Sequence, residues 1–229
     1  MSNWSADEIE IVWLSLKVAT VATLASAVPA IAVAWLLARG RFWGRSVLNV
    51  LVHLPLVVPP VVTGYFLLRI FGRRGPVGAW LEQVLGLQFS FRWTGAALAA
   101  AVMAFPLVVR AIRLGIESVD RQTEEAAATL GASPVWTFAT ITLPLALPGV
   151  LAGLALGFAK ALGEFGATIT FVSNIPGETR TLALAIFTEL DKPGGDAVAM
   201  RLAWLSIAIS VGALAVSEWL SRSAKRGQA

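Results

Sequence analysis

Residues 11–37 have the sequence IVWLSLKVATVATLASAVPAIAVAWLL, and this stretch decides the class of fold. Lys17 is its single charged residue and lies near one end, where a lysine can extend its ammonium group to the membrane interface. About 20 apolar residues are enough for a helix to cross the hydrocarbon core of a bilayer. The stretch therefore predicts a membrane-spanning helix.

The composition of the whole chain points the same way. Its 229 residues are 57% hydrophobic and 14% charged, and the mean hydropathy is +0.74, whereas soluble domains are roughly 45 to 50% apolar and about 25% charged. Four further apolar stretches cover approximately residues 47–68, 93–109, 143–162 and 202–220. We therefore expect an all-α, polytopic membrane protein with about five transmembrane helices in a single domain, residues 1–229.

Several functional classes are excluded by what the sequence lacks. With no cysteine and one histidine, His53, a single chain can form neither a thiolate nor a multi-histidine metal site, and we expect no cofactor. The net charge of +4 comes from basic residues scattered between apolar stretches, which argues against a nucleic-acid partner. A Gly-x4-Gly-Lys-Ser/Thr loop is absent, so the chain cannot be its own ATPase. The lack of a Gly-x-Ser-x-Gly frame argues against an intramembrane hydrolase.

The charged residues also suggest an orientation in the membrane. Asp7, Glu8 and Glu10 stand where a cleavable signal peptide would be positive, so we expect the first span to remain in the mature chain. Nine cations follow the first, third and fifth spans, and seven lie on the opposite side. The nine are Arg39, Arg41, Arg45, Arg110, Arg113, Arg121, Arg222, Lys225 and Arg226; the seven are Arg69, Arg73, Arg74, Arg92, Arg180, Lys192 and Arg201. This small excess favours an external amino terminus and a cytoplasmic carboxyl terminus.

A long polar connection, residues 120–141, separates the third and fourth spans. Residues 122–130 are rich in Glu and Ala and favour a helix, and Gly131 supplies a stop at its carboxyl end. Ser133 can cap a second helix whose first residue is Pro134. We expect two short helices in series, after which the chain turns into the fourth span.

The second of these helices has an apolar side, formed by Trp136, Phe138 and Ile141. A compact pair of helices at the membrane surface is typical of a docking site for another protein. The alternative is an ordinary amphipathic segment that lies in the interface.

The connection carries a motif: Glu-Ala-Ala, three residues, Gly, nine residues, and Ile-x-Leu-Pro. It resembles the cytoplasmic signature of the permease subunits of ATP-binding-cassette (ABC) importers, in which this loop sits in a cleft of the ATPase subunit and couples the two. The resemblance implies a fold like that of type I importer permeases. It assigns ATPase coupling to Glu125, Ala126, Ala127, Gly131, Ile141, Leu143 and Pro144.

A second group of segments narrows the resemblance within this family. Three segments look like those of permeases for tetrahedral oxyanions: ALGEFGAT at residues 161–168, LPLVVPP at 54–60 and FVSNIPGETRT at 171–181. The whole chain is most similar to bacterial molybdate permeases. Tungstate and sulfate permeases belong to the same group and are the alternatives. The resemblance suggests a translocation path or gate near Pro59, Pro60, Gly163, Glu164, Phe165, Gly166 and Thr168.

Glu164 lies between Gly163 and Gly166 at the end of a span, where a carboxylate is costly unless it is hydrated or paired. One interpretation makes it a structural anchor that binds exposed backbone donors or pairs with Lys160 one helical turn earlier. The other makes it part of the gate. Direct contact with an oxyanion is disfavoured because the two negative charges repel.

The resemblance also implies the partners of the chain. These are a second copy of itself, two ATP-binding cassette subunits, a periplasmic or lipid-anchored oxyanion-binding protein, and the bilayer of the bacterial inner membrane. A channel or secondary transporter is the rival class, and it would carry charged residues inside its spans. Here the charged residues in the spans, Lys17, Lys160, Glu164 and Glu218, lie near their ends.

Overall fold

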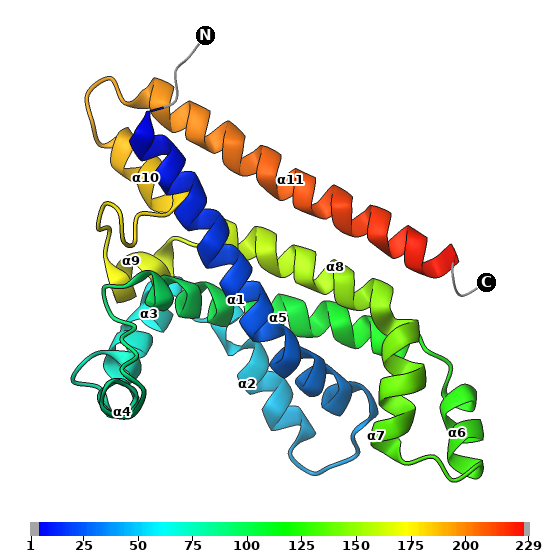
Figure 1. The fold of residues 1–229 in the computed structure, drawn as a ribbon. Coiled ribbons are helices and arrows are strands. Elements are labelled where there is room, and N and C mark those ends of the chain that lie inside the picture. The colour runs from blue at the N-terminus through cyan, green and yellow to red at the C-terminus, as the bar shows by residue number, and fades with distance from the viewer. Residues whose placement is uncertain (1–4, 227–229) are drawn as a thin grey trace.

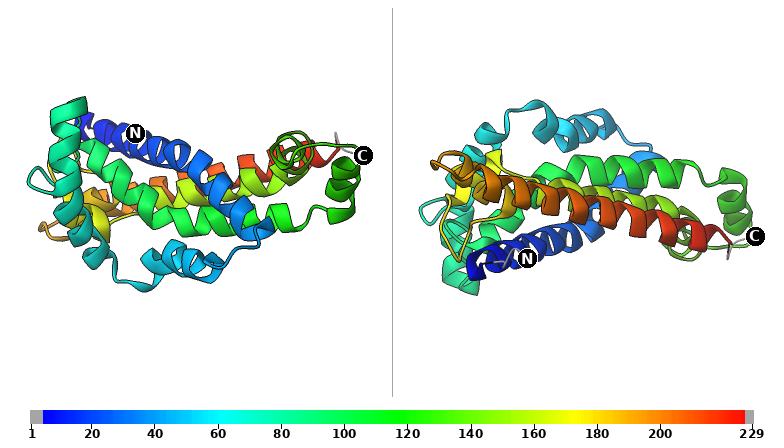
Figure 2. Two further views of the ribbon diagram at one scale, coloured as in Figure 1. Left: turned by 90° about the horizontal axis from the view of Figure 1, so that it is seen from below. Right: turned by 90° about the horizontal axis from the view of Figure 1, so that it is seen from above.

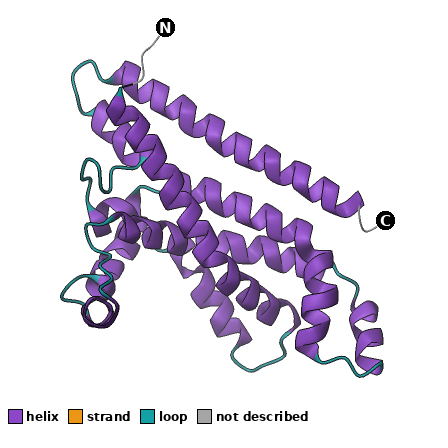
Figure 3. Ribbon diagram, viewed as in Figure 1, coloured by secondary structure: helices purple, strands orange, loops and turns teal. Residues whose placement is uncertain are grey.

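The computed structural model describes the backbone of residues 5–226 and the side chains of residues 5–221, and within these ranges it contains helices and no strand (Figure 3). The helices in chain order are α1 Ala6–Arg39, α2 Arg45–Val57, α3 Pro60–Phe71, α4 Pro76–Leu85, α5 Trp93–Glu117, α6 Arg121–Thr129, α7 Pro134–Thr137, the π-helical η1 Phe138–Thr142, α8 Leu143–Leu162, α9 Gly166–Val172, α10 Leu182–Leu190 and α11 Asp196–Arg226. The all-α prediction is confirmed for the described residues.

Within residues 5–226, four helices are long and apolar enough to cross a membrane. These are α1, α5, the continuous helix from α7 to α8, and residues Asp196–Ser221 of α11. The pair α2 and α3 makes a fifth candidate span if the two are counted together. The expected ranges 11–37, 93–109, 143–162 and 202–220 overlap the four long helices.

The second expected span, residues 47–68, is not one straight helix. It breaks between Val57 and Pro60, and the axes of α2 and α3 differ by 112°. Pro59 lacks a backbone donor, and Val58 before it is extended, with ψ of 137°, as expected for a residue that precedes proline. The apolar run coincides with α2 and α3, and the proline pair divides it.

The long helices run side by side, and the connecting helices gather at the two ends (Figures 1 and 2). One end of the molecule holds α6 and α7, together with the carboxyl ends of α1 and α5 and the start of α8. The other end holds α3, α4, α9 and α10. Glu8 and Arg201, 2.7 Å apart, join the starts of α1 and α11 at the latter end. Ser221 donates a hydrogen bond to the Pro148 carbonyl at the end that holds α6.

The closest packing joins α5 to α8 through small residues. A Cβ atom on Gly149 would lie 2.6 Å from the Cα of Gly115, and one on Gly157 would lie 2.5 Å from a methyl carbon of Val108. Glycine at such contacts lets two helix backbones approach closely, which is the usual way that helices associate inside a bilayer. Val108 and Ile112 are fully buried in the apolar cluster that this contact supports.

Two parts of the fold differ from the sequence-based expectation. The second helix of the connection is not separate from the fourth span, because α7, η1 and α8 form one run of helix from Pro134 to Leu162. The run changes direction between α7 and α8 (Figure 1). In addition, the sequence analysis did not predict the short helices α4, α9 and α10.

Candidate functional site

The first candidate site is the coupling segment, which we define as residues 120–144. Asp120 caps its first helix by accepting a hydrogen bond from the Gln122 N–H at 3.0 Å. α6 then ends at Thr129, and Gly131 has a φ of +87°. The N–H of Gly131 donates to the carbonyl of Ala128, and that of Ala132 to the carbonyl of Ala127. This pair of bonds is the Schellman arrangement, which favours glycine at the left-handed position.

The chain then enters its second helix as the sequence predicted. Ser133 is the N-cap, its hydroxyl accepts from the Trp136 N–H at 3.3 Å, and Pro134 is the first helical residue. After α7 the helix widens into the π-helical turn η1, where Phe138 packs on Trp35 of α1 with ring centroids 5.0 Å apart. This contact holds the coupling segment against the carboxyl end of the first span.

The residues expected to dock an ATPase subunit are unequally exposed. Glu125, Ala126 and Gly131 are exposed, whereas Ala127 is buried. Ile141 and Leu143 are half-buried, and Pro144 is exposed. The most exposed large apolar side chains of the segment are Leu130 (89% exposed), Val135 (69%) and Trp136 (56%). Trp136 was expected to lie on the same apolar side as Phe138, but it faces outward instead. Exposed apolar side chains together at one end of the molecule are typical of a protein interface.

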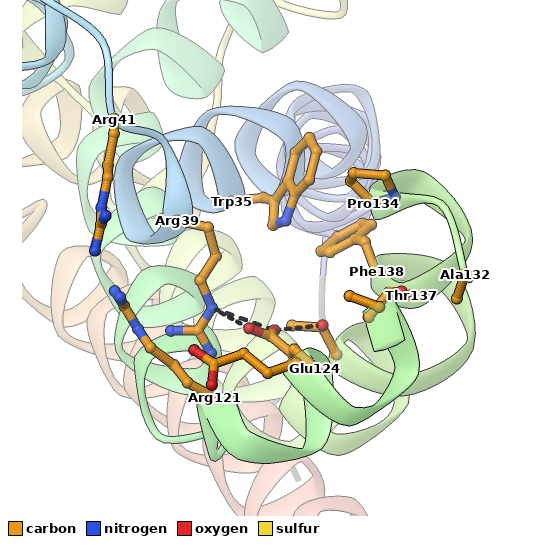
Figure 4. A pocket seen from close by; sticks show the side chains of 12 residues that line it. Trp35, Arg39, Arg41, Arg121, Glu124, Ala132, Pro134, Thr137 and Phe138 are labelled. Carbon is orange, nitrogen blue, oxygen red and sulfur yellow. Dashed lines mark hydrogen bonds and ion pairs between the residues drawn. The ribbon is translucent and has the colours of Figure 1, made fainter. Parts of the chain in front are cut away.

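A cavity of about 380 Å³ lies between the coupling segment and the end of α1 (Figure 4). Glu124 lines it and pairs with Arg39, with 2.8 Å between Oε2 and Nε. The Thr142 hydroxyl donates to Glu124 Oε1 at 2.6 Å. Sequence reasoning did not assign a site role to Glu124 or Thr142, and it used Arg39 only as a topological charge.

The second candidate site surrounds Glu164, where the backbone leaves regular helix. α8 ends at Leu162 and α9 begins at Gly166. The Glu164 side chain is 2% exposed, and its Oε2 lies 2.6 Å from the Nζ of Lys160. Its Oε1 accepts a hydrogen bond from the Ala167 N–H at 3.0 Å. Both contacts expected of a structural anchor are therefore present.

The break between α2 and α3 packs against this same turn. A Cβ on Gly166 would lie 2.7 Å from the Cβ of Pro60, and a Cβ on Gly64 would lie 2.5 Å from the carbonyl oxygen of Ala167. The structure thus brings Pro60 and Gly166 together, although they are far apart in the sequence.

The other candidate path residues occupy different environments around this contact. Pro59 and Gly163 are exposed, and Thr168 is buried. Phe165 stacks at a tilt on Phe187, with centroids 5.0 Å apart. Among the residues that the structure describes, no three His, Cys, Asp or Glu side chains gather closely enough to hold a metal ion.

Comparison with known proteins identifies the family. A family model described as "Binding-protein-dependent transport system inner membrane component" matches residues 30–226. The chain therefore belongs to this family, the multi-pass inner-membrane permeases of ABC importers. Within the family it is 57% identical over 215 residues to the "Molybdenum transport system permease protein ModB" of Haemophilus influenzae, with 94% of each chain covered. It is 56% identical over 215 residues, again with 94% of each chain covered, to the protein of the same name from Escherichia coli K12.

The fold agrees with this family. A bacterial ABC transporter "involved in the import of the acidic polysaccharide alginate" has a chain that superposes with a TM-score of 0.74 at 16% identity, covering 96% of this chain and 80% of that one. The chain is thus the non-catalytic membrane component of an ABC transporter, which works with an ATPase and a binding protein. The predicted class is confirmed, and the rival class of channel or secondary transporter is excluded.

Proposed function

We propose that this permease carries molybdate from the periplasm into the cytoplasm. The observation that carries the proposal is the 57% identity, over 94% of both chains, to a relative named as a molybdenum transport permease. Molybdate and tungstate are tetrahedral dianions of nearly equal size, so tungstate is an alternative cargo, and we expect the external binding protein to make most of the selection. Sulfate is the other alternative cargo within the same group.

The uptake profile tests this assignment. We expect ATP enclosed in the lumen of proteoliposomes that hold the permease and its ATPase to drive molybdate uptake, with the binding protein and molybdate supplied outside. An equal concentration of tungstate should compete strongly, and sulfate should compete weakly. Accumulation of sulfate in preference to molybdate would overturn the choice of cargo while leaving the transporter class intact.

The working assembly is proposed to contain two copies of this chain, two ATPase subunits and one binding protein. Irregular backbone at membrane depth is tolerated where it is buried in protein or lines a water-filled cavity. Val57 is 82% exposed in the single chain, and Pro59, Pro60 and Gly163 are exposed as well. A second copy that faces this break, with the path between the copies, gives the irregular backbone the environment it needs.

In the proposed cycle, ATP binding closes the ATPase dimer and draws the two coupling segments together. The segment can receive this motion because it presents the exposed side chains of Leu130, Val135 and Trp136. Reorientation of the long helices then changes the side of the membrane to which the path opens. The anion enters from the binding protein and leaves to the cytoplasm.

This cycle requires the coupling segment to be cytoplasmic, with the amino terminus outside and the carboxyl terminus inside. α6 lies at the end of the molecule opposite the start of α1 (Figure 1), so one orientation decides all three locations. The excess of cations at the α6 end supports this orientation. Arg222, Lys225 and Arg226 contribute to that excess, and their side chains lie outside the described residues.

Single cysteines test the orientation against a background that has none. Gln83 on α4, Asp191 after α10 and Gln122 on α6 are all exposed. In intact spheroplasts, an impermeant thiol reagent should label Gln83→Cys and Asp191→Cys, whereas Gln122→Cys should react only after the membrane is opened. Labelling of Gln122→Cys in sealed spheroplasts, with the other two protected, would reverse the orientation.

A further inference from the structure

The ion pair between Arg39 and Glu124 joins segments that are distant in the sequence. Arg39 is the last residue of α1, and its Nη2 donates to the carbonyls of Ile116 and Val119, each at 2.9 Å. Its Nε lies 2.8 Å from Oε2 of Glu124 on α6. Thr142, the last residue of η1, donates to the same carboxylate at 2.6 Å. One guanidinium and one carboxylate therefore connect α1, the end of α5, α6 and the helix that continues as α8 (Figure 4).

The pair is shielded far more than a typical surface pair. The Arg39 and Glu124 side chains are 14% and 17% exposed, and Thr142 is 1% exposed. Removal of one partner from a shielded ion pair leaves a charge without compensation, which costs much more than loss of a surface pair. The pair Arg113–Glu117 at the end of α5 offers a contrast, with exposures of 29% and 35%.

α6 has little other attachment to the membrane helices. All nine residues of α6 are described, and Ala127 alone among them is buried. Its apolar packing is therefore small, and the Glu124 carboxylate supplies direct side-chain bonds to α1 and to η1. The π-helical geometry of η1 is a second indication, since π-helical turns occur frequently at functional sites.

We propose that Glu124 is the positioning residue that fixes α6 to the spans, so that motion applied to the coupling segment reaches α1 and α8 together. The inference rests on the proposed function, in which an ATPase moves this segment. Glu125, the residue that the motif assigns to docking, is exposed and lines the same cavity, and it is left available to the partner. Glu124, its neighbour, faces the permease itself. The two adjacent glutamates therefore differ in environment: Glu124 is bonded to α1 and η1, and Glu125 is exposed.

The experiment measures oxyanion transported per ATP hydrolysed in proteoliposomes that contain permease, ATPase and binding protein. Glu124→Gln should assemble and hydrolyse ATP, but its transport per ATP should fall about fivefold, the lower end of ordinary coupling effects. Thr142→Val keeps the ion pair and nearly the same volume, and it should lower the ratio about twofold because it removes one hydrogen bond. Glu117→Gln, in the exposed pair on α5, is the matched control and should equal wild type.

Each outcome decides the proposal. An unchanged transport ratio in Glu124→Gln or in Thr142→Val overturns it, and so does an equal fall in Glu117→Gln. If Glu124→Gln fails to assemble, the ratio in Thr142→Val makes the decision. The measurement uses whichever of molybdate, tungstate and sulfate the wild-type complex carries. If the proposed cargo is wrong, the wild-type complex carries a different anion. If Glu124 is not the positioning residue, Glu124→Gln keeps the wild-type ratio of anion transported to ATP hydrolysed.

Discussion

Glu164→Ala is expected to lower ATP-driven uptake more than about tenfold, the effect of roughly 1.4 kcal/mol. The side chain is 2% exposed and serves two groups, the ammonium of Lys160 and the N–H of Ala167. Alanine leaves that N–H without its acceptor, and an unsatisfied buried donor costs about 1 to 3 kcal/mol. Because the donor lies in the first turn of α9, which packs on α3 at the proline break, the damage should spread to both irregular segments.

Glu164→Gln separates the role of shape from that of charge. Glutamine keeps an oxygen acceptor for the Ala167 N–H, and Lys160 is 32% exposed and can turn its ammonium toward water. We therefore expect uptake within about threefold of wild type, since a partly exposed ion pair contributes about 1 kcal/mol or less. Lys160→Gln leaves the buried carboxylate of Glu164 without its cation, so it should lower uptake more than Glu164→Gln does, but less than Glu164→Ala.

Uptake assays at matched levels of assembled complex check these expectations. Equal and complete loss in Glu164→Gln and Glu164→Ala would show that the charge itself is essential, and the gate interpretation would replace the structural one. Loss in Lys160→Gln as deep as in Glu164→Ala would instead assign the effect to the ion pair.

The sequence predicted the features that depend on local chemistry. Gly131 ends α6 with a positive φ, and Ser133 and Pro134 begin α7, because caps and helix stops are determined by residues within one turn. The turn at Glu164 was predicted for the same reason, since glycines on both sides of a carboxylate interrupt a span. These features need no knowledge of the tertiary contacts.

Features that depend on distant contacts were not predicted. Glu124 and Glu125 are adjacent and identical, and the rotation of α6 that turns Glu124 inward depends on Arg39, 85 positions earlier. The angle between α2 and α3 likewise depends on contacts of Gly64 and Pro60 with α9. A hydropathy pattern gives the position and length of an apolar segment, but it carries no information on the direction of a bend.

The short helices α9 and α10 were missed because each is too short for a span. α10 has nine residues, and its first N–H group, that of Leu182, is satisfied by the Ser15 hydroxyl of α1 at 2.7 Å. Such a helix is stabilised by tertiary contacts rather than by its own sequence, because short isolated helices are marginal in water. Leu182 and Leu184 are fully buried, which supplies that stabilisation.

The second large effect is expected at the turn between α6 and α7. Gly131→Val should weaken association with the ATPase subunit about tenfold and should lower transport in parallel. The φ of +87° is a left-handed conformation that costs an L-residue roughly 1 to 2 kcal/mol, and a β-branched side chain is the least suited to it. A Cβ at this position would meet nothing within 4 Å, so the cost comes from the backbone and not from a clash.

Two comparisons isolate the cause. Gly131→Asn should lose much less than Gly131→Val, because asparagine tolerates the left-handed region. Gly86 at the end of α4 has a φ of +66° and also has open space around it, so Gly86→Val introduces similar strain at the opposite end of the molecule. Gly86→Val should leave ATPase association unchanged.

Pull-down of the ATPase subunit by detergent-solubilised permease measures this association directly. Wild-type affinity in Gly131→Val would mean that the left-handed turn does not set the docking geometry. An equal loss in Gly86→Val would mean that strain acts through general destabilisation. The expected pattern, a loss in Gly131→Val with recovery in Gly131→Asn, follows because the turn holds Leu130, 89% exposed, at the surface that meets the partner. A change of backbone angle at Gly131 alters the direction of that side chain and the start of α7 together.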